Sequence, residues 1–278
     1  MNRISNILIL IVFVLSLNET AQPQNSISTK KVSDYSLYNT KAEFVYSEIV
    51  ADSFFILISV PDKYYSSENR YPVLYVLDGD IAYGMAASIS RYLQIGDNIP
   101  QLIVVGIGYG SLSRKASGNR LRDYRPEQSG GAENFLKFLD DELIPYIDEN
   151  YRTVPGDRTL NGYSLGGLFG LYTLFTKPES FSNYIIGSPN LSWDDYVIFQ
   201  YEENSPEKIG DKQLNIFISV GQGESEERYF NPVDSLVTNI QQHNYPGVYM
   251  ETQVFNGSTH LMGPPESLTH GLISVIGR

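Results

Sequence analysis

The sequence contains no cysteine and only three histidines, His243, His260 and His270. The absence of cysteine excludes disulfide bonds, thiolate nucleophiles and thiolate metal sites. No two of the histidines have the spacing of a helical or hairpin metal site. We therefore expect neither a bound metal nor another cofactor.

Basic residues are also few. The 278 residues include 20 Lys and Arg against 32 Asp and Glu, which gives a formal net charge of −12. This balance argues against a nucleic-acid partner, because such binding neutralises phosphates with Lys and Arg. A hydrophobic content of 42% is instead typical of a globular chain with a large buried core.

The apolar run ILILIVFVLSL at residues 7–17 follows Arg3. It is too short to span a bilayer comfortably and suits the apolar segment of a signal peptide. We predict a signal peptide over residues 1–21, a flexible leader over residues 22–40, and export to the periplasm or the cell exterior. No stable membrane span is expected after processing. An uncleaved membrane anchor is the alternative, whereas a lipidated anchor is excluded because no cysteine follows the run.

Residues 41–278 form one predicted domain in which β-strands and α-helices alternate. The first two predicted strands, AEFVYSEIV and SFFILISV, suit an antiparallel hairpin. Later runs such as LIVVGIG are apolar throughout, which is typical of strands covered by helices on both faces. The pattern predicts an α/β fold with a mostly parallel central sheet, helices on both faces and the hairpin at one edge. We also expect a long loop at residues 111–130, a helix at residues 133–151 that Pro145 bends or ends, and a polar segment at residues 191–210.

The segment LNGYSLGGLFG places Ser164 between Gly162 and Gly166, after a predicted strand and before a predicted helix. A G-x-S-x-G pattern in this setting is typical of a nucleophile elbow. The serine lies on a strained turn, where bulky neighbours two residues away would collide with the strand or the helix. The turn also puts Ser164 at a helix N-terminus, where backbone N–H groups favour developing negative charge. The alternative is a glycine-rich packing turn.

A serine hydroxyl is a weak nucleophile and requires a base. Elbow enzymes carry the serine, the acid and the histidine in that order along the chain. His260 follows the last predicted strand, and we predict it to be the general base. The acid should follow the preceding strand, where Glu224, Glu226 and Glu227 all qualify. We assign Glu224 because its path to His260 is shortest, while the other two glutamates and a dyad without an acid remain open.

An oxyanion hole requires two preorganised N–H groups. One is predicted to be the N–H of Leu165, directly after the nucleophile. The other should come from the turn Asp78-Gly79-Asp80, which follows a predicted strand. Asp78 and Asp80 have an alternative interpretation as a carboxylate pair for acid–base chemistry or for a cation.

Seven segments in order resemble the "Putative esterase" family of the α/β-hydrolases, over about residues 40–275. The family includes S-formylglutathione hydrolases, feruloyl and acetylxylan esterases, mycolyltransferases and siderophore esterases. The resemblance implies the α/β-hydrolase fold, Ser164 as nucleophile, His260 as base, and Asp80 and Leu165 as N–H donors. The resemblance also favours Glu224 as the acid. Within the family, the sequence is most similar to the enterochelin and bacillibactin esterases. The segments are YPVLYVLDGD, LIVVGIGY, RLRDYRP, LNGYSLGGLFGLYTLF, IIGSPNLSW, ISVGQGESE and GSTH.

Residues 111–130 carry a local excess of three positive charges in an otherwise acidic chain. We predict that Arg120 and Arg122, together with Trp193, bind an anionic and aromatic substrate. The alternative is that these arginines pair with structural acids.

Taken together, the residues and the resemblance predict an exported serine esterase that hydrolyses carboxylic esters through an acyl-enzyme on Ser164. The expected substrate is a small-molecule or carbohydrate ester, of the siderophore or acylated-carbohydrate type. Acyl transfer on the same fold and a non-catalytic binding protein are the alternatives. The sequence does not determine the oligomeric state.

Overall fold

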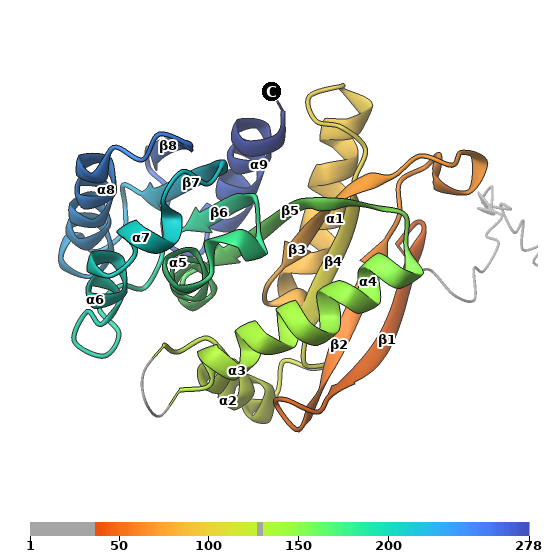
Figure 1. The fold of residues 1–278 in the computed structure, drawn as a ribbon, viewed down its shortest axis with the longest axis horizontal. Helices are drawn as coiled ribbons and strands as arrows, with labels where there is room; N and C mark the ends of the chain where they lie inside the picture. Colours follow the sequence, from red (N-terminus) through yellow and green to blue (C-terminus); the bar gives the residue numbers. More distant parts are fainter. Residues whose placement is uncertain (1–36, 127–129, 278) are drawn as a thin grey trace, which may run out of the picture. The chain divides into compact units, whose positions relative to one another are not determined.

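The computed structural model describes residues 37–126 and 130–277 (Figure 1). The predicted signal peptide and residues 22–36 of the predicted leader lie outside these residues. None of the helices in the described part has both the length and the apolar character that crossing a membrane requires.

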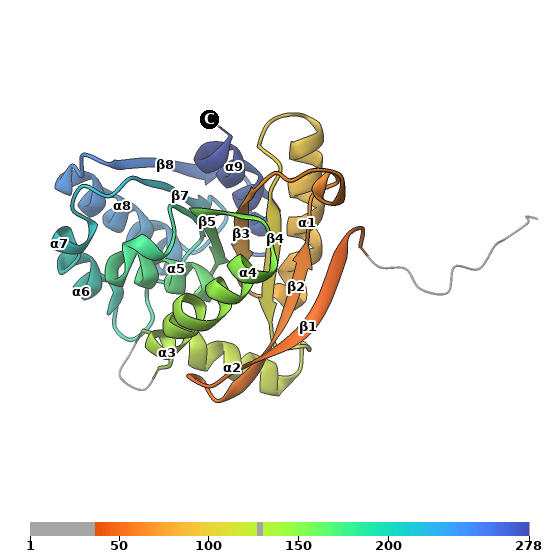
Figure 2. The same cartoon turned by 45° about the vertical axis from the view of Figure 1, so that its right-hand side comes forward.

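Eight strands form a single sheet within the described residues (Figures 1 and 2). Their order across the sheet is β1-β2-β4-β3-β5-β6-β7-β8. The strands are β1 (Thr40–Ser47), β2 (Asp52–Ser59), β3 (Tyr71–Val76), β4 (Ile103–Gly108), β5 (Thr153–Tyr163), β6 (Asn183–Gly187), β7 (Leu214–Gly221) and β8 (Val248–Phe255).

The pairing directions agree with the predicted fold class. β1 and β2 form the antiparallel hairpin, with Thr40 opposite Ser59 and Ser47 opposite Asp52. β2 also runs antiparallel to β4, and every pair from β4 through β8 is parallel. The order reverses at β3, because the chain passes from β3 outward to β4 and then returns to β5 on the other side of β3. In open α/β sheets, ligands bind beyond the carboxyl ends of the strands at such a point.

Helices cover both faces of the sheet, as the apolar strands predict. Along β3 the side chains alternate between faces, with Val73 and Tyr75 in one hydrophobic cluster and Leu74 and Val76 in the other. α1 and α9 cover the second face, and α3, α5 and α8 cover the first. The helices are α1 (Gly79–Ile95), α2 (Arg114–Asp123), α3 (Ala132–Lys137), α4 (Ile144–Asn150), α5 (Leu165–Thr176), α6 (Ile198–Glu203), α7 (Pro206–Ile209), α8 (Asn231–His243) and α9 (Gly263–Ile276).

Two predicted segments differ from the structure. The expected loop at residues 111–130 is wrong in its centre, because α2 occupies residues 114–123. The Ser113 hydroxyl caps this helix by accepting from the N–H of Ala116. Further along, the predicted helix at residues 133–151 is divided into α3, a π-helical segment at Phe138–Leu143 and α4, with Pro145 in the first turn of α4. The π segment shifts the hydrogen-bond register just before the residue that lacks an N–H.

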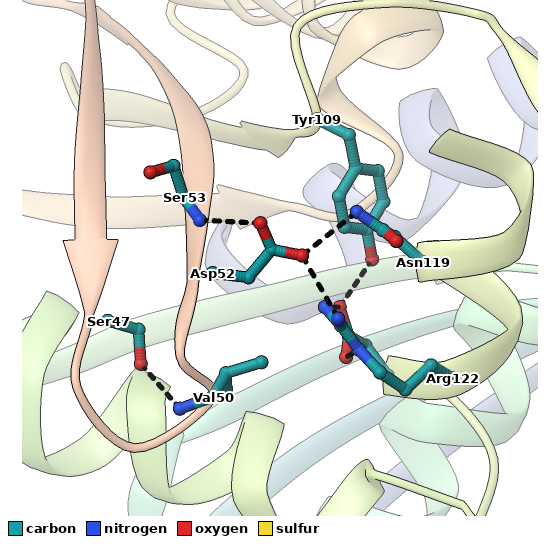
Figure 3. Close-up of polar contacts among 8 residues, drawn as sticks. Ser47, Val50, Asp52, Ser53, Tyr109, Asn119 and Arg122 are labelled. Carbon is teal, nitrogen blue, oxygen red and sulfur yellow. Dashed lines mark hydrogen bonds and ion pairs between the residues drawn. The ribbon is translucent and has the colours of Figure 1, made fainter. Parts of the chain in front are cut away.

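A polar network attaches α2 to the hairpin (Figure 3). The Asp52 carboxylate accepts from the N–H of its neighbour in β2, from Nδ2 of Asn119 at 3.1 Å, and from Nη1 of Arg122 at 3.0 Å. Arg122 also donates to Asp123 through Nε at 2.6 Å and Nη2 at 3.0 Å. The Tyr109 hydroxyl donates to the same Asp123 carboxylate at 3.1 Å. Charged hydrogen bonds therefore fix the position of a helix whose own sequence is mostly polar.

Replacing Arg122 with Met should lower the free energy of unfolding by about 2–3 kcal/mol, because the fully buried Asp123 carboxylate loses its cation. Lys137→Met is the matched control, since it removes an exposed ion pair with Glu133 and should cost less than about 1 kcal/mol. Chemical denaturation at neutral pH measures both losses. Equal losses would contradict the structural role of Arg122.

Candidate active site

A cavity of about 480 Å³ lies beyond the carboxyl ends of β3, β4 and β5, where the strand order reverses. Its lining includes Asp78 after β3, Tyr109 after β4 and Ser164 after β5. His260, from the connection between β8 and α9, lines the same cavity. The fold therefore brings four segments that are distant in sequence to one pocket.

Ser164 directly precedes α5, in a backbone conformation that few residues other than glycine adopt. Its φ is 59° and its ψ is −116°. Three backbone hydrogen bonds hold this conformation: the Ser164 N–H donates to the Gly187 carbonyl at 2.9 Å, and the Ser164 carbonyl accepts from Leu168 and Asn190 at 3.0 Å each. Such strain persists where the surrounding structure fixes it, and it is common at functional sites.

The glycines flanking Ser164 are explained by close approach of the strand to the helix. A Cβ atom on Gly162 would lie 2.2 Å from the carbonyl oxygen of Gly166, far inside van der Waals contact. A Cβ on Gly166 would lie 3.4 Å from the Asp78 carboxylate, which is tight but tolerable. Gly162 is thus the residue whose missing side chain allows β5 and α5 to approach this closely.

Glu224 and His260 lie in direct contact. The distance between Glu224 Oε2 and His260 Nδ1 is 2.6 Å. The Glu224 carboxylate is fully buried and also accepts from the N–H of Gly221 at 3.0 Å and from the Ser188 hydroxyl. Of the three glutamates considered from the sequence, Glu224 is the one that the structure brings to His260. Glu226 and the following glutamate are exposed, in a π-helical segment at Glu226–Phe230.

Burial by itself would raise the pKa of the Glu224 carboxyl. The hydrogen bonds from His260, Ser188 and the Gly221 N–H outweigh burial, so its pKa lies below the ordinary value. The carboxylate therefore stays ionised at neutral pH. An ionised acceptor at Nδ1 fixes the imidazole with its proton on that atom, which leaves Nε2 as the basic nitrogen.

Two helix N-termini border the pocket beside Ser164. Leu165 opens α5, and Asp80 is the second residue of α1, so both N–H groups belong to first turns that lack intrahelical acceptors. The Asp80 carboxylate accepts from the N–H groups of Tyr109 at 2.5 Å and Gly110 at 2.8 Å. These bonds fix the start of α1 against the end of β4. That Asp80 and Leu165 act as oxyanion donors remains a prediction.

Arg120 lines the pocket, but its guanidinium is already paired. It binds the Asp78 carboxylate through Nε at 2.5 Å and Nη2 at 2.9 Å. Asp78 has a positive φ of 56°, and its N–H donates to the Tyr124 hydroxyl at 3.1 Å. The pair therefore holds the turn that leads into α1. With Asp78 bound to Arg120 and Asp80 bound to two N–H groups, the two carboxylates do not form an acid–base pair.

Arg122 and Trp193 are not among the residues that line the pocket. Arg122 points toward the hairpin, as Figure 3 shows, because Asp52 and Asp123 bind its guanidinium. The Trp193 ring packs partly buried against the core, with the Arg125 guanidinium 4.7 Å from its centroid. The predicted grouping of Arg120, Arg122 and Trp193 at one site therefore does not occur. The pairing of Arg120 and Arg122 with carboxylates instead matches the alternative interpretation.

Sequence reasoning missed two polar residues around the site, Ser188 and Tyr163, and one ion pair, that of Asp78 with Arg120. Ser188 follows β6, at the edge of the sheet where Ser164 and Glu224 also lie, and its hydroxyl donates to Glu224. The Tyr163 hydroxyl is a second, longer donor to that carboxylate, at 3.4 Å. Asp78 orients Arg120. Ser188 could have been found from its position directly after an apolar strand. The Asp78–Arg120 pair joins two segments that are distant in sequence, so no sequence pattern indicated it. The described residues contain no cluster of His, Asp and Glu suited to a metal ion.

The chain has clear relatives among known proteins. The family model "Putative esterase" matches residues 47–262. The ferri-bacillibactin esterase BesA of Bacillus subtilis (strain 168) is 29% identical over 228 residues, which cover 73% of this chain and 78% of that protein. A siderophore triacetylfusarinine C esterase of Aspergillus fumigatus is 32% identical over 46% of this chain and 47% of its own. The crystal structure of the BES protein from Bacillus cereus superposes with a TM-score of 0.82 at 28% identity, covering 89% of this chain and 98% of that chain.

Gly162→Ala should destabilise the protein by at least about 2 kcal/mol, because the new methyl group meets backbone that cannot move aside. Gly118→Ala, in the exposed middle of α2 with no atom near the new methyl, should change the stability by less than about 1 kcal/mol. Thermal unfolding followed by circular dichroism compares the two. A tolerated Gly162→Ala would contradict the tight turn.

At acid pH, the free energy of unfolding should decrease in a way that depends on the Glu224 carboxylate. Because the folded-state pKa of Glu224 is depressed, its contribution is complete above about pH 5 and is lost as the pH falls through and below about 4. In Glu224→Gln, the free energy of unfolding should therefore fall less steeply over this range than in the unmodified chain. Glu226→Gln should keep the original slope. Urea titrations at a series of pH values provide the measurement, and identical slopes in all three proteins would rule out the linkage.

Proposed function

The chain belongs to the "Putative esterase" family, and on this premise we propose that it hydrolyses carboxylic esters of the siderophore type through an acyl-enzyme on Ser164. The observation that carries the proposal is the bond between the buried Glu224 carboxylate and His260, in a pocket that Ser164 also lines. A serine elbow, a histidine and an acid in this order are the elements of a nucleophilic triad.

In the first half of the reaction, Ser164 Oγ attacks the ester carbonyl carbon. The hydroxyl proton passes to Nε2 of His260, and the Glu224 carboxylate stabilises the imidazolium that forms. When the tetrahedral intermediate collapses, the bond between the carbonyl carbon and the alcohol oxygen breaks. The alcohol leaves with the proton from His260, and the acyl group remains on Ser164.

In the second half, a water molecule takes the place of the alcohol. His260 accepts a proton from the water as it attacks the acyl carbon, and returns that proton to Ser164 Oγ as the acid product leaves. The N–H groups of Leu165 and Asp80 stabilise the oxyanion in both halves. First-turn N–H groups suit this task because they are preorganised and lie at the positive ends of helix dipoles.

The siderophore type of ester is proposed from the named relatives. The Bacillus subtilis and Aspergillus fumigatus proteins are both siderophore esterases by name. The cavity of about 480 Å³ is large enough for one acyl or aromatic group of such a molecule. A hydrolysis screen over p-nitrophenyl acyl esters, feruloyl sugars, acetylated xylan and catecholate triesters tests this choice of substrate.

Ser164→Ala and His260→Ala should each lower kcat by at least about a thousandfold, because members of a triad act as a unit. An organophosphonate probe should label the unmodified chain at Ser164 and leave Ser164→Ala unlabelled, as mass spectrometry would detect. Retained hydrolysis in Ser164→Ala would refute the acyl-enzyme. A chain that neither reacts with the probe nor hydrolyses any ester would instead be a binding protein on this fold.

Glu224→Gln should lower kcat by roughly a thousandfold or more with little change in KM, because the nucleophile and the base remain but the imidazole loses its orienting charge. Glu226→Gln and Glu227→Gln are matched controls that make the same change at exposed positions, and they should keep nearly full activity. Steady-state kinetics on one p-nitrophenyl ester compares the three variants. If Glu224→Gln loses less than about tenfold, His260 works without this carboxylate.

A further inference from the structure

Apolar side chains from three separate segments surround the mouth of the pocket. Ile81 of α1, Leu112 before α2 and Leu261 before α9 all line it. Their exposed fractions are 71%, 71% and 89%, so solvent reaches most of each side chain. Single exposed leucines are ordinary, but convergence of three on one cavity marks a surface that binds an apolar group.

The charges that line the same pocket do not favour an anion. Arg120 is the only lysine or arginine among the described lining residues, and Asp78 binds it in a bidentate manner. Asp80 adds a second carboxylate to the lining. Apart from His260, the fixed charges therefore sum to a slight negative excess, within a chain whose formal net charge is −12.

Arg122, another basic residue of α2, lies on a different face of that helix from Arg120. Ala116 and Arg120, four positions apart, share the face that lines the pocket. Arg122 is two positions from Arg120, which places it about 200° around the helix. The contact of Arg122 with Asp52 on the hairpin agrees with this direction. Folding of residues 114–123 into a helix thus directs Arg122 away from the pocket, and neither Arg114 nor Lys115 lines it.

We propose that the pocket selects uncharged esters with an apolar group next to the reacting carbonyl and discriminates against esters that carry a carboxylate. Leu112 and Leu261 form the surface that this apolar group contacts. The inference rests on the proposed esterase function. Among siderophore-type esters, a pocket of this kind favours uncharged molecules over a ferric catecholate complex, which is a polyanion.

The test compares two p-nitrophenyl esters of equal length, the valerate and the monoglutarate, which differ by a methyl group against a carboxylate at the far end of the acyl chain. After correction for their rates with hydroxide, kcat/KM should be at least about tenfold higher for the valerate, because the carboxylate is desolvated beside apolar groups and two aspartates. An equal or higher value for the glutarate would overturn the proposal.

Leu112→Arg should raise kcat/KM for the glutarate relative to the valerate by about fivefold or more, since it puts an unpaired cation at the pocket mouth. Ile95→Arg is the matched control, because it adds the same charge at a similarly exposed leucine-sized side chain, at the end of α1 that is remote from the pocket. If Ile95→Arg shifts the ratio as much as Leu112→Arg, selection by the pocket is refuted.

Failure of the proposed function gives a different result from failure of the selectivity. If neither ester is hydrolysed, the esterase function fails. Binding of the corresponding p-nitroanilides, measured by calorimetry on the unmodified chain and on Leu112→Arg, then decides the selectivity. Tighter binding of the valeryl anilide, with the preference reduced in Leu112→Arg, supports the proposal, and equal binding overturns it.

Discussion

The site depends on one constraint: the parallel strands from β4 to β8 all end at the same edge of the sheet. The residues just after each strand therefore lie along that edge, which brings Asp78, Ser164 and Ser188 to the same side of the sheet although they are far apart in the chain. Glu224 and His260 arrive there in the same way, from the turns after β7 and β8. Reversal of the strand order at β3 opens the space between the β3 and β5 turns that the pocket occupies.

Most of the fold and the contact between Glu224 and His260 could be predicted from the sequence, because both follow from local patterns. Apolar runs identified the strands, and the glycine spacing around Ser164 identified the turn before α5. The assignment of Glu224 over its neighbours needed only the shortest path from β7 to His260, and the contact of 2.6 Å agrees with it. These inferences depend on spacing along the chain, which the sequence displays directly.

The inferences that failed concern the surroundings of charged groups. Residues 114–123 have no apolar periodicity, so nothing marked them as a helix, and a loop would have allowed Arg122 to reach the substrate. The helix instead fixes Arg122 against its neighbour Asp123 and against Asp52, which lies on the hairpin. Partners of this kind are set by the three-dimensional arrangement. A count of positive charges in a segment therefore does not reveal whether any of them faces the pocket.

The polar attachment of α2 has a consequence for behaviour in salt. The Asp52–Arg122 contact is partly open to solvent, with exposed fractions of 27% and 37%, so dissolved ions screen it, whereas the buried Asp123 carboxylate is largely shielded from them. The attachment of α2 to the hairpin thus weakens at high ionic strength, while the contact between Asp123 and the Tyr109 hydroxyl persists. Since α2 also carries Ala116 and Arg120 at the wall of the pocket, the salt-sensitive contact belongs to an element that lines the cavity. Ionic strength therefore acts on the attachment of this wall of the pocket to the hairpin.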